Sequence, residues 1–580
     1  MGIPSYFKHL VNSVKSIVSN QKPISHIDWL WMDFNCLIYH CLQRPGLRAY
    51  AGSYGSEEHK LWEKELLNEI NNYCSEVVRQ VDPAKGVFIA VDGVVPMAKI
   101  KQQRMRRFKS IWLKKYAGAG GSEQKASSSW DTNAITPGTE FMKKLRKSLE
   151  DLAKHKNSRK IKWRVSSSDE SGEGEHKIIS EWRTKKYSGN HAVYGLDADL
   201  IVLSLLTQQI VGRDFIQNVV LFREVIEGGH ITRDEIGQEK YHWFSIDVLK
   251  DTLYNIIMGD GMGDGVGDGV SIDDKTVIMQ YCCLMSILGN DFLPTSLGLK
   301  IKTDGHSYLL NLIREMLVDK KLKVVDSDGA LSMEGLVYIF KKLSENEEKS
   351  IFRNIMRKNK NKEIIERGLQ KGHGSSPKIG EDNWVNSEFV EESLLYEYTK
   401  EDENGNLVAR KTMNNRWKNI YLKKWFPPGM TPPISANEYV RGIFWNWDYY
   451  CGRKIDTQWY YPWSLPPLWS WVFSAIQMRD REVGEVHEMS PMKPHEISSI
   501  RGARGAECLS HEQLAIVLPT ESWHLIPKEH THVRTFPERC PYFFPVDFEF
   551  FSCGKQFFWE CEPEIQIPTL NELRNGGSVV

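Results

Sequence analysis

The chain has 580 residues, of which 41% are hydrophobic and 26% are charged, and its 75 basic residues balance its 75 acidic ones. This composition is typical of a globular protein and excludes a disordered chain. Because the formal net charge is zero, any surface for nucleic acid has to come from local segregation of charge.

The ten cysteines form no CxxC pair, and several stand in apolar surroundings such as "QYCCLM". This pattern predicts reduced thiols in a cytosolic setting, without a disulfide framework or a zinc site. The chain has no apolar run of about 18 residues, and its first residues lack a long apolar core. We therefore expect a cytoplasmic protein with no signal peptide, no transmembrane helix and no membrane partner.

Up to about residue 206, short apolar runs of β type alternate with amphipathic stretches. We expect strands at residues 29–35, 86–93, 161–169 and 191–197. We expect helices over residues 61–81 and 139–155, where apolar residues recur three and four apart. Strands separated by helices predict an α/β fold with a mostly parallel central sheet flanked by helices.

The rest of the chain divides into segments of different composition. The Gly/Asp run at 259–269 superficially resembles calcium-binding repeats, but without a β-helix context we expect a flexible surface insertion. A buried helix should follow it and end at Gly289. We predict a charged linker or insertion at 341–416, an aromatic-rich second region at 417–560 packed around the first, and a tail at 561–580.

Acidic residues follow the predicted strands at or just beyond their carboxyl ends. These residues are Asp33, Asp92, Glu173, Glu175, Asp197 and Asp199, and Asp291 follows the buried helix. Ligands of open α/β sheets bind at the carboxyl ends of strands, so the side chains should converge there. Glu173 and Glu175, like Asp197 and Asp199, lie two residues apart, which in an extended backbone places both on one face.

Any one of these aspartates is more often a helix cap or a turn residue. Capping does not, however, explain a carboxylate after every strand. Two carboxylates about 5 Å apart repel by roughly 3 kcal/mol at an effective dielectric near 20, so such a cluster needs cations. All-oxygen ligands suit Mg²⁺ or Mn²⁺ better than zinc. Two such ions can promote hydrolysis of a phosphodiester.

A basic helix is expected directly after Asp92. Residues 99–115 contain eight Lys or Arg and no acidic residue. Lys99, Gln103, Arg106 and Arg107 share one helical face, which suits a phosphate. A solvated basic helix is the default interpretation of an isolated charge run, but the position beside a metal-site strand favours phosphate binding.

Several stretches resemble, in order, the motifs of the Xrn family of 5′→3′ exoribonucleases. In the first region they are "DFNCLIYHC", "AVDGVVPMAKIKQQRMRRFK", "NAITPGTEFM", "SGEGEHKI", "HAVYGLDADLIVLSLL" and "ILGNDFLP". In the second region they are "YVRGIFWNWDYYCG", "WYYPWSLPP" and "HEQLAIVLP". The resemblance implies a nuclease core of the PIN-like and flap-nuclease type at 1–340.

The resemblance also implies the activity and its residues. The family degrades single-stranded RNA processively from a 5′-monophosphate to 5′-mononucleotides, and it rejects capped or triphosphorylated ends. The seven carboxylates would bind two Mg²⁺ ions as the catalytic set. The substrate-binding residues would be Asn35, Tyr39, His40, Lys99, Gln103, Arg106, Arg107 and Trp459, with Trp459 stacking on the 5′ base.

The chain departs from the family pattern at several points. Tyr39 stands where the family's first motif has a base-stacking histidine, and His40 lies beside it. No cysteine/histidine zinc knuckle occupies the position of the Gly/Asp run, and the chain stops soon after the second region, which predicts a compact version. We expect a monomer. Decapping enzymes are a partner that the residues do not themselves identify.

Two other functions stay open at this stage. The chain could be a DNA-directed 5′ nuclease of the same superfamily, although it shows no helix-hairpin-helix signature for duplex DNA. It could also be a catalytically inactive RNA-binding scaffold. The complete set of seven carboxylates argues against a scaffold, because a pure binder gains nothing from negative charge next to a polyanion.

Overall fold

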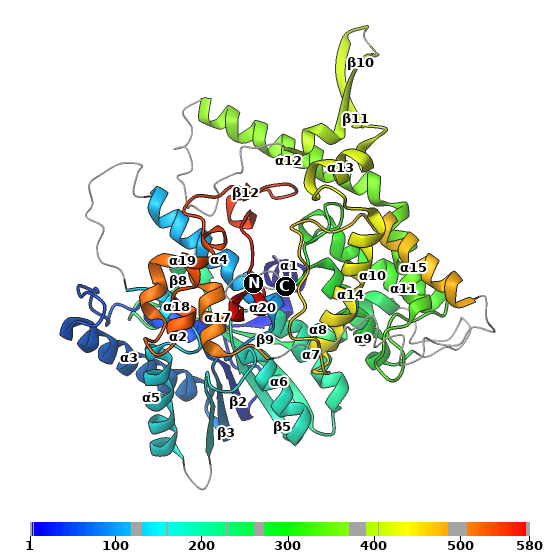
Figure 1. Ribbon diagram of the computed structural model, residues 1–580. Helices are drawn as coiled ribbons and strands as arrows, with labels where there is room; N and C mark the ends of the chain where they lie inside the picture. The colour runs from blue at the N-terminus through cyan, green and yellow to red at the C-terminus, as the bar shows by residue number, and fades with distance from the viewer. Residues whose placement is uncertain are drawn as a thin grey trace.

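The computed structural model of the chain describes residues 3, 5–117, 130–157, 161–227, 230–259, 272–370, 390–403, 405–484 and 507–575 (Figure 1). Most of the Gly/Asp run and the last five residues of the tail, for which we made predictions, lie outside these ranges. Within them, no helix is long and apolar enough to cross a membrane.

A seven-stranded sheet forms the centre of the first region, in the order β1-β9-β6-β5-β2-β3-β4. The strands are β1 (Val18–Ser19), β2 (Ile27–Asp33), β3 (Pro83–Ala90), β4 (Lys162–Ser166), β5 (Gly189–Tyr194), β6 (Ile216–Glu224) and β9 (Tyr241–Ser245). The five strands from β6 to β4 are parallel, whereas β9 and β1 each run antiparallel to their neighbour. The predicted α/β fold with a mostly parallel sheet is confirmed, and so are its four predicted strands.

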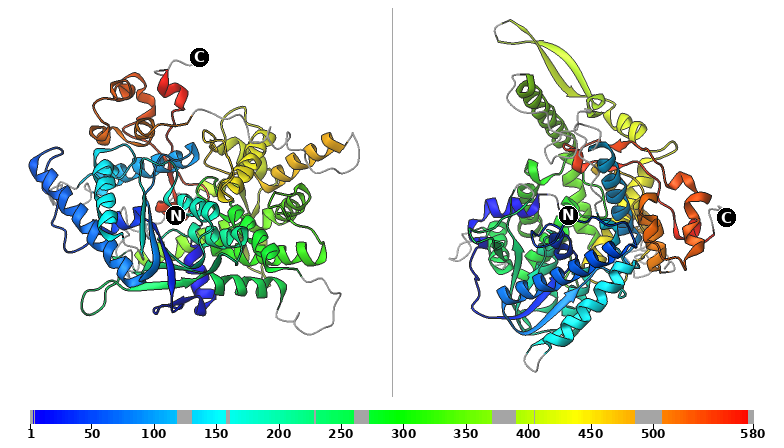
Figure 2. Two further views of the ribbon diagram at one scale, coloured as in Figure 1. Left: turned by 90° about the horizontal axis from the view of Figure 1, so that it is seen from below. Right: turned by 90° about the vertical axis from the view of Figure 1, so that its left-hand side faces the viewer.

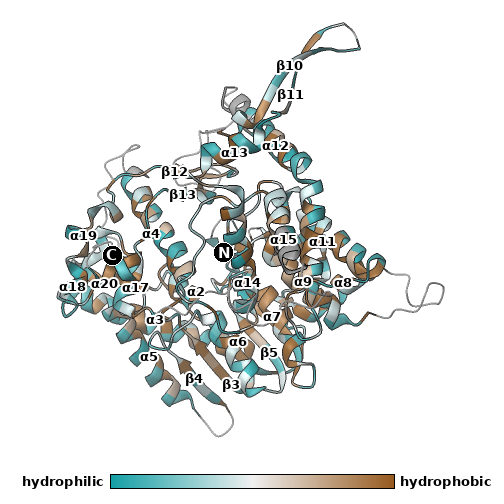
Figure 3. Cartoon of the chain, turned by 45° about the vertical axis from the view of Figure 1, so that its right-hand side comes forward, coloured by the Kyte–Doolittle hydropathy of each residue, from teal (hydrophilic) through white to brown (hydrophobic). Residues whose placement is uncertain are grey.

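Helices cover both faces of the sheet, and β2 shows why its sequence is apolar throughout. Leu30 and Met32 pack in the cluster that contains α3 (Glu57–Val81) and α5 (Glu140–Lys156). Trp31 points the other way, with its ring 5.4 Å from that of Trp182 in α6 (Gly174–Lys185). Alternate residues of a strand face opposite sides, so a strand covered on both faces needs apolar residues at every position. Figure 3 shows hydrophobic residues on β3, β4 and β5 and on parts of the helices beside the sheet.

The helices begin and end where their capping residues predict. Ser56 accepts a hydrogen bond from the His59 amide at the start of α3, and Thr139 does the same for Met142 in α5. The buried helix α9 (Asp274–Leu288) ends at Gly289, as predicted.

The second region packs on both layers of the first. The helices α14 (Pro432–Tyr450) and α15 (Trp469–Gly484) join the core cluster of α6, α7 (Asp199–Val211) and α9. Helix α17 (Ser510–Val517) joins the other cluster, beside α3 and α5. In Figure 1 these two parts lie on opposite sides of the molecule, and Figure 2 shows them from two further directions. The predicted aromatic-rich second region around the α/β core is confirmed.

The segment predicted as a charged linker contains regular structure. Helix α12 (Glu347–Gln370) follows α11 (Met333–Glu345), and Ile351 and Ile355 of α12 are buried. The hairpin of β10 (Leu395–Glu401) and β11 (Leu407–Met413) projects from the body of the molecule (Figure 1). Charge dominated the prediction because most residues of α12 are polar or charged. The domain boundaries themselves stay predictions.

The basic helix is α4 (Met97–Ala117), and several of its cations fasten the second region to the first. Lys101 Nζ donates to the Tyr461 carbonyl (2.7 Å), and Lys109 Nζ donates to those of Phe558 and Cys561 (2.6 and 2.7 Å). The fully buried guanidinium of Arg104 donates to three carbonyls of the second region, those of Ile516, Phe543 and Gln566. The helix is therefore a structural joint as well as a candidate phosphate site.

Replacing Arg104 should show whether its hydrogen bonds to the second region, rather than its charge alone, stabilise the fold. Arg104→Met leaves three carbonyls without this donor, two of them buried, so we expect the free energy of unfolding to fall by about 3 kcal/mol. Denaturant unfolding measures the change. Lys114→Met, which removes an exposed charge from the same helix, should have little effect. Equal midpoints for both variants would contradict the structural role of Arg104.

Candidate active site

Six of the seven predicted carboxylates stand at the carboxyl edge of neighbouring strands. Asp33 is the last residue of β2, and Asp92 lies two residues beyond the end of β3. Glu173 is the N-cap of α6 and Glu175 lies in its first turn, while Asp199 is the first residue of α7. Asp197 lies in the turn between β5 and α7. Because β5, β2 and β3 are adjacent and parallel, the side chains converge, as predicted.

Glycine at position 174 allows the carboxylates to approach each other. A Cβ at Gly174 would lie 2.6 Å from Asp33 Oδ1, which no side chain tolerates. The amide of Gly174 instead donates to Asp92 Oδ1 (2.7 Å), while Asn35 Nδ2 donates to Asp92 Oδ2 (2.9 Å). Asn35 also accepts from the Asp92 amide (3.2 Å). In this structure Asn35, predicted to bind substrate, orients Asp92.

Ligand atoms of the cluster form two groups that could each hold a metal ion, one of carboxylate oxygens alone and one that includes a histidine nitrogen. One oxygen each of Asp33, Glu175 and Asp197 lie within 4.8 Å of one another. Ligand atoms of Glu173, Glu175 and His176 form a second such group. Two oxygens in the cluster, Glu175 Oε2 and Asp199 Oδ1, are buried without a hydrogen-bond partner. Buried polar atoms normally have partners, so these two oxygens fit a missing cation.

Burial and mutual repulsion make the carboxylates hard to ionise. Burial, followed by the charge of Glu173, raises the pKa of Asp92 to about 6. Burial, followed by the charge of Asp291, raises the pKa of Asp199 to about 7. The pKa values of Asp33 and Glu175 are also raised well above the usual range, first by burial and then by neighbouring carboxylates. Bound cations would reverse these shifts.

Lys99 supplies a positive charge to this cluster in the structure. Its Nζ lies 2.5 Å from Glu173 Oε2 and 2.7 Å from Asp291 Oδ2. Although burial alone would raise it, the Lys99 ammonium lowers the pKa of the Asp291 carboxyl. Asp291, the seventh predicted carboxylate, therefore joins the other six through Lys99. The same contacts place Lys99 among the acids, whereas we predicted it to bind a phosphate.

The second region contributes a residue that sequence reasoning missed. The Tyr449 hydroxyl in α14 donates to Glu173 Oε1 (2.8 Å), and its ring stacks on His176 at 3.7 Å between centroids. Glu173 and His176 lie within the motif "SGEGEHKI", and Tyr449 lies within "WNWDYYCG". Nothing in their spacing indicates that a tyrosine more than 270 residues from Glu173 reaches its carboxylate.

The remaining predicted phosphate residues lie along α4 beside the cluster. Arg106 is 40% exposed, and its Nη2 lies 4.0 Å from Asp291 Oδ1. Arg107 has a buried guanidinium nitrogen, Nη1, without a partner. Gln103 Oε1 accepts from Gln513 Nε2 of α17 (3.2 Å), so the second region also orients this face. Tyr39, in α2 (Asn35–Cys41), is 45% exposed and has ring surface available for a base.

Two predicted substrate residues do not join this group. His40 is buried, with Nε2 3.5 Å from Glu239 and its ring 4.6 Å from that of Tyr73. Consecutive residues of a helix point about 100° apart, so when Tyr39 faces outward His40 faces the core.

Trp459 is also buried, and its exposed fraction is 4%. Its indole donates to Glu438 (3.2 Å) and packs on Trp445, with 5.2 Å between ring centroids. These contacts give Trp459 a role in packing the second region. The stacking of Trp459 on a base stays a prediction.

Comparisons with known proteins agree with this arrangement. Residues 1–212 match the family model described as "XRN 5'-3' exonuclease N-terminus". Human "5'-3' exoribonuclease 1" is 26% identical over 99% of this chain and 34% of its own length. "5'-3' exoribonuclease 2" of Candida albicans is 24% identical over 99% of this chain and 71% of its own length.

The similarity extends beyond the part covered by the family model. A "5'-3' exoribonuclease 2" of Debaryomyces hansenii is 28% identical over 61% of this chain and 39% of its own length. The chain thus spans little more than a third of the length of the first curated relatives that it matches. The family model covers the strands that carry six of the seven carboxylates, and two of these relatives align over nearly the whole chain. Over nearly its whole length, the chain is therefore similar to the 5′→3′ exoribonucleases of the Xrn family.

Proposed function

We propose that this chain is a 5′→3′ exoribonuclease that degrades single-stranded RNA with a 5′-monophosphate to 5′-mononucleotides. The observation that carries the proposal is the buried carboxylate cluster with two unpartnered oxygens, next to the arginines of α4. The similarity to exoribonucleases supports the nuclease activity, and the geometry supports the choice of cofactor and end group.

Two Mg²⁺ ions, or Mn²⁺ ions, fit the donor set because every predicted ligand is a carboxylate oxygen. Glu175 belongs to both candidate groups of ligands, so it is the residue that would bridge them. When bound, such ions supply Lewis-acid chemistry for phosphodiester hydrolysis, by activating the attacking water and stabilising the leaving oxygen.

Other residues of the chain orient the candidate metal ligands and offer contacts for the RNA end. Asn35 and the Gly174 amide orient Asp92, and Tyr449 orients Glu173. Arg107 offers an unpartnered N–H donor, which is what a terminal phosphate requires. Tyr39 offers a ring on which the first base can stack. A closed pocket of this kind would exclude ends with more than one phosphate by steric clash.

The alternatives have less support. If the chain were an inactive scaffold, the buried, unpartnered oxygens of Glu175 and Asp199 would have no function to offset their cost in stability. A DNA-directed nuclease is disfavoured because the relatives that align over the whole chain are named as exoribonucleases. A cytoplasmic location, a monomeric state and an association with decapping enzymes stay predictions.

The direct test is a degradation time course on matched single-stranded RNAs that carry a 5′-monophosphate, a 5′-hydroxyl or a 5′-triphosphate. With Mg²⁺, the monophosphate substrate alone should release mononucleotides. EDTA should abolish release, and Asp199→Ala should lower the rate at least 100-fold, because it removes an oxygen that no other group replaces. Equal attack on all three RNAs would sink the end-group assignment, and RNA binding without cleavage would favour the scaffold.

Arg107→Gln tests the phosphate contact separately. Loss of a charge-assisted hydrogen bond should lower kcat/KM for the monophosphate RNA by about tenfold or more, mainly through KM. The affinity for 5′-hydroxyl RNA, measured by binding in EDTA, should not change, because that end lacks the phosphate. Lys114→Gln, an exposed cation on the same helix, is the matched control. Equal losses on both RNAs would assign Arg107 to general RNA affinity.

Stability against pH tests the carboxylate cluster without any substrate. The pKa values of Asp92 and Asp199, about 6 and about 7, exceed the value of about 3.9 for an unfolded aspartate. The folded protein therefore binds more protons than the unfolded chain between about pH 4 and pH 7. Its free energy of unfolding should consequently fall as the pH rises through this range. In metal-free protein, the fall in Tm between pH 5 and pH 8 should be smaller for Asp199→Asn than for the wild type.

Metal should act in the opposite direction. Mg²⁺ should raise the Tm of the wild-type protein more at pH 8 than at pH 5, because only ionised carboxylates bind it. The rise should be smaller in Asp199→Asn. Asp214→Asn, an exposed carboxylate outside the cluster, should behave as the wild type does. Identical responses of the two variants would exclude Asp199 from the metal site.

A further inference from the structure

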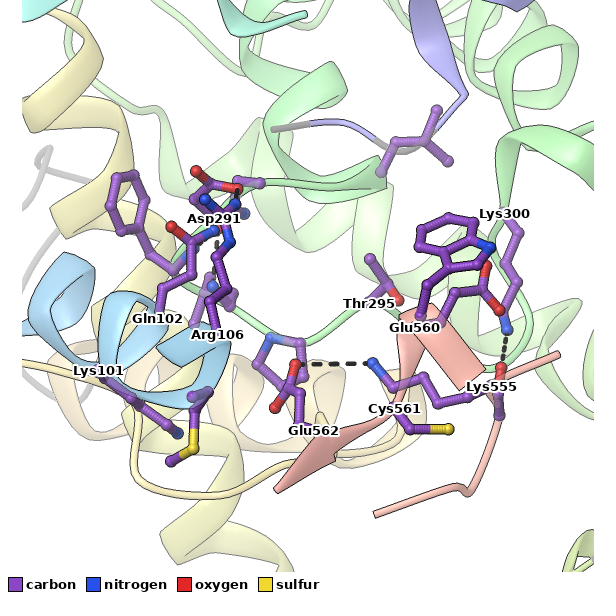
Figure 4. A pocket seen from close by; sticks show the side chains of 18 of the residues that line it. Lys101, Gln102, Arg106, Asp291, Thr295, Lys300, Lys555, Glu560, Cys561 and Glu562 are labelled. Atoms are coloured by element: carbon purple, nitrogen blue, oxygen red, sulfur yellow. Dashed lines mark hydrogen bonds and ion pairs between the residues drawn. The ribbon is translucent and has the colours of Figure 1, made fainter. Parts of the chain in front are cut away.

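A cavity of about 250 Å³ lies on another face of α4 from Gln103 and Arg107. One wall is formed by Lys101, Gln102 and Met105 of α4, and the others by residues 290–302 and 554–563. Figure 4 shows Gln102 and Arg106 on one side of the open space and Thr295 and Glu560 on the other, with Asp291 at one end. Asp291 and Arg106 line the cavity and also belong to the carboxylate site, so the two sites are contiguous.

Basic side chains outnumber acidic ones around this cavity. The basic residues are Lys101, Arg106, Lys109, Lys300, Lys302 and Lys555, and the acidic ones are Asp291, Glu560 and Glu562. Lys555 lies 3.7 Å from Glu562, and Lys302 lies 3.8 Å from Glu560, so these two pairs are loose. A cavity with excess positive charge next to a candidate phosphodiesterase site suits an anionic ligand.

An exposed aromatic ring lines the same cavity. The indole of Trp559 is 39% exposed, although most tryptophans of the described residues are buried. Lys302 Nζ lies 5.4 Å from the centroid of the Trp559 ring and 4.8 Å from that of Phe557. On the facing wall, Gln102 Oε1 is buried and has no hydrogen-bond partner. An exposed indole, cations and an unsatisfied acceptor together match the parts of a nucleotide.

We propose that this cavity binds a nucleotide, with its base stacked on Trp559 and its phosphate beside Arg106. Gln102 Oε1 accepts a hydrogen bond from the base or from the ribose. The nucleotide is either a unit of the RNA strand or a free 5′-mononucleotide, since both carry the same chemistry. The choice of ligand rests on the proposed function, but the site is distinct from the α4 face that carries Gln103 and Arg107.

Binding in EDTA tests this site without cleavage. Calorimetry of the full chain would use 5′-AMP in one arm and a 5′-phosphorylated single-stranded decanucleotide RNA in the other. Trp559→Ala should raise the Kd about tenfold in at least one arm, because a base stacked on an aromatic ring contributes on the order of 1–3 kcal/mol. Trp559→Phe should restore most of the affinity. Tyr542→Ala, an exposed aromatic residue that does not line the cavity, is the matched control.

The two arms distinguish the sources of the nucleotide. Weaker binding of 5′-AMP would identify a site for the free mononucleotide, and weaker binding of the decanucleotide alone would place a unit of the strand in the cavity. Unchanged affinity in both arms, with Trp559→Ala folded as judged by Tm, would overturn the proposal. The ring would then serve only to fasten residues 554–563. Because this experiment measures binding and no cleavage, its result does not depend on the outcome of the nuclease assay.

Discussion

The repulsion among buried carboxylates at the carboxyl edge of the sheet is the constraint on which the rest of the structure depends. Burial raises the pKa values of Asp33, Asp92, Glu175 and Asp199, and neighbouring carboxylates raise them further, whereas the charge of Lys99 lowers them. Without metal, the cluster relies on Lys99 and on bound protons for compensation. Such an arrangement costs stability, and a protein keeps it only where the charges have a function.

Helix α4 connects this electrostatic problem to the rest of the molecule. Its first turn brings Lys99 into the cluster, and its later turns use Lys101, Arg104 and Lys109 to hold carbonyls of the second region. The faces that remain carry Gln103 and Arg107 on one side and the cavity residue Gln102 on another. A helix that looks uniformly basic in the sequence thus divides its cations among three tasks.

That division explains how far the sequence could predict the site. Asp33, Asp92 and the Glu173/Glu175 pair were predictable, because the end of a strand fixes where a side chain lies and parallel strands align their ends. The fates of Lys101 and Arg104 were not, because their carbonyl partners lie more than 300 residues away in the chain. His40 and Trp459 show the same limit: the resemblance placed both among the substrate-binding residues, but only tertiary packing decides which side chain is exposed.

Tyr449 shows why the second region is more than a cover. Its hydroxyl provides Glu173 with a donor, and its ring holds His176 beside the same carboxylate. Gln513 links the loop after β3 to Gln103, because its Oε1 accepts from the Val95 amide and its Nε2 donates to the side-chain Oε1 of Gln103. Two segments of the second region, α14 and α17, therefore approach the site from different sides, and each fixes a residue of the first region. Neither could do so if the second region were a separately folded appendage, so the catalytic geometry is a property of the whole assembly of strands and helices rather than of the sheet alone.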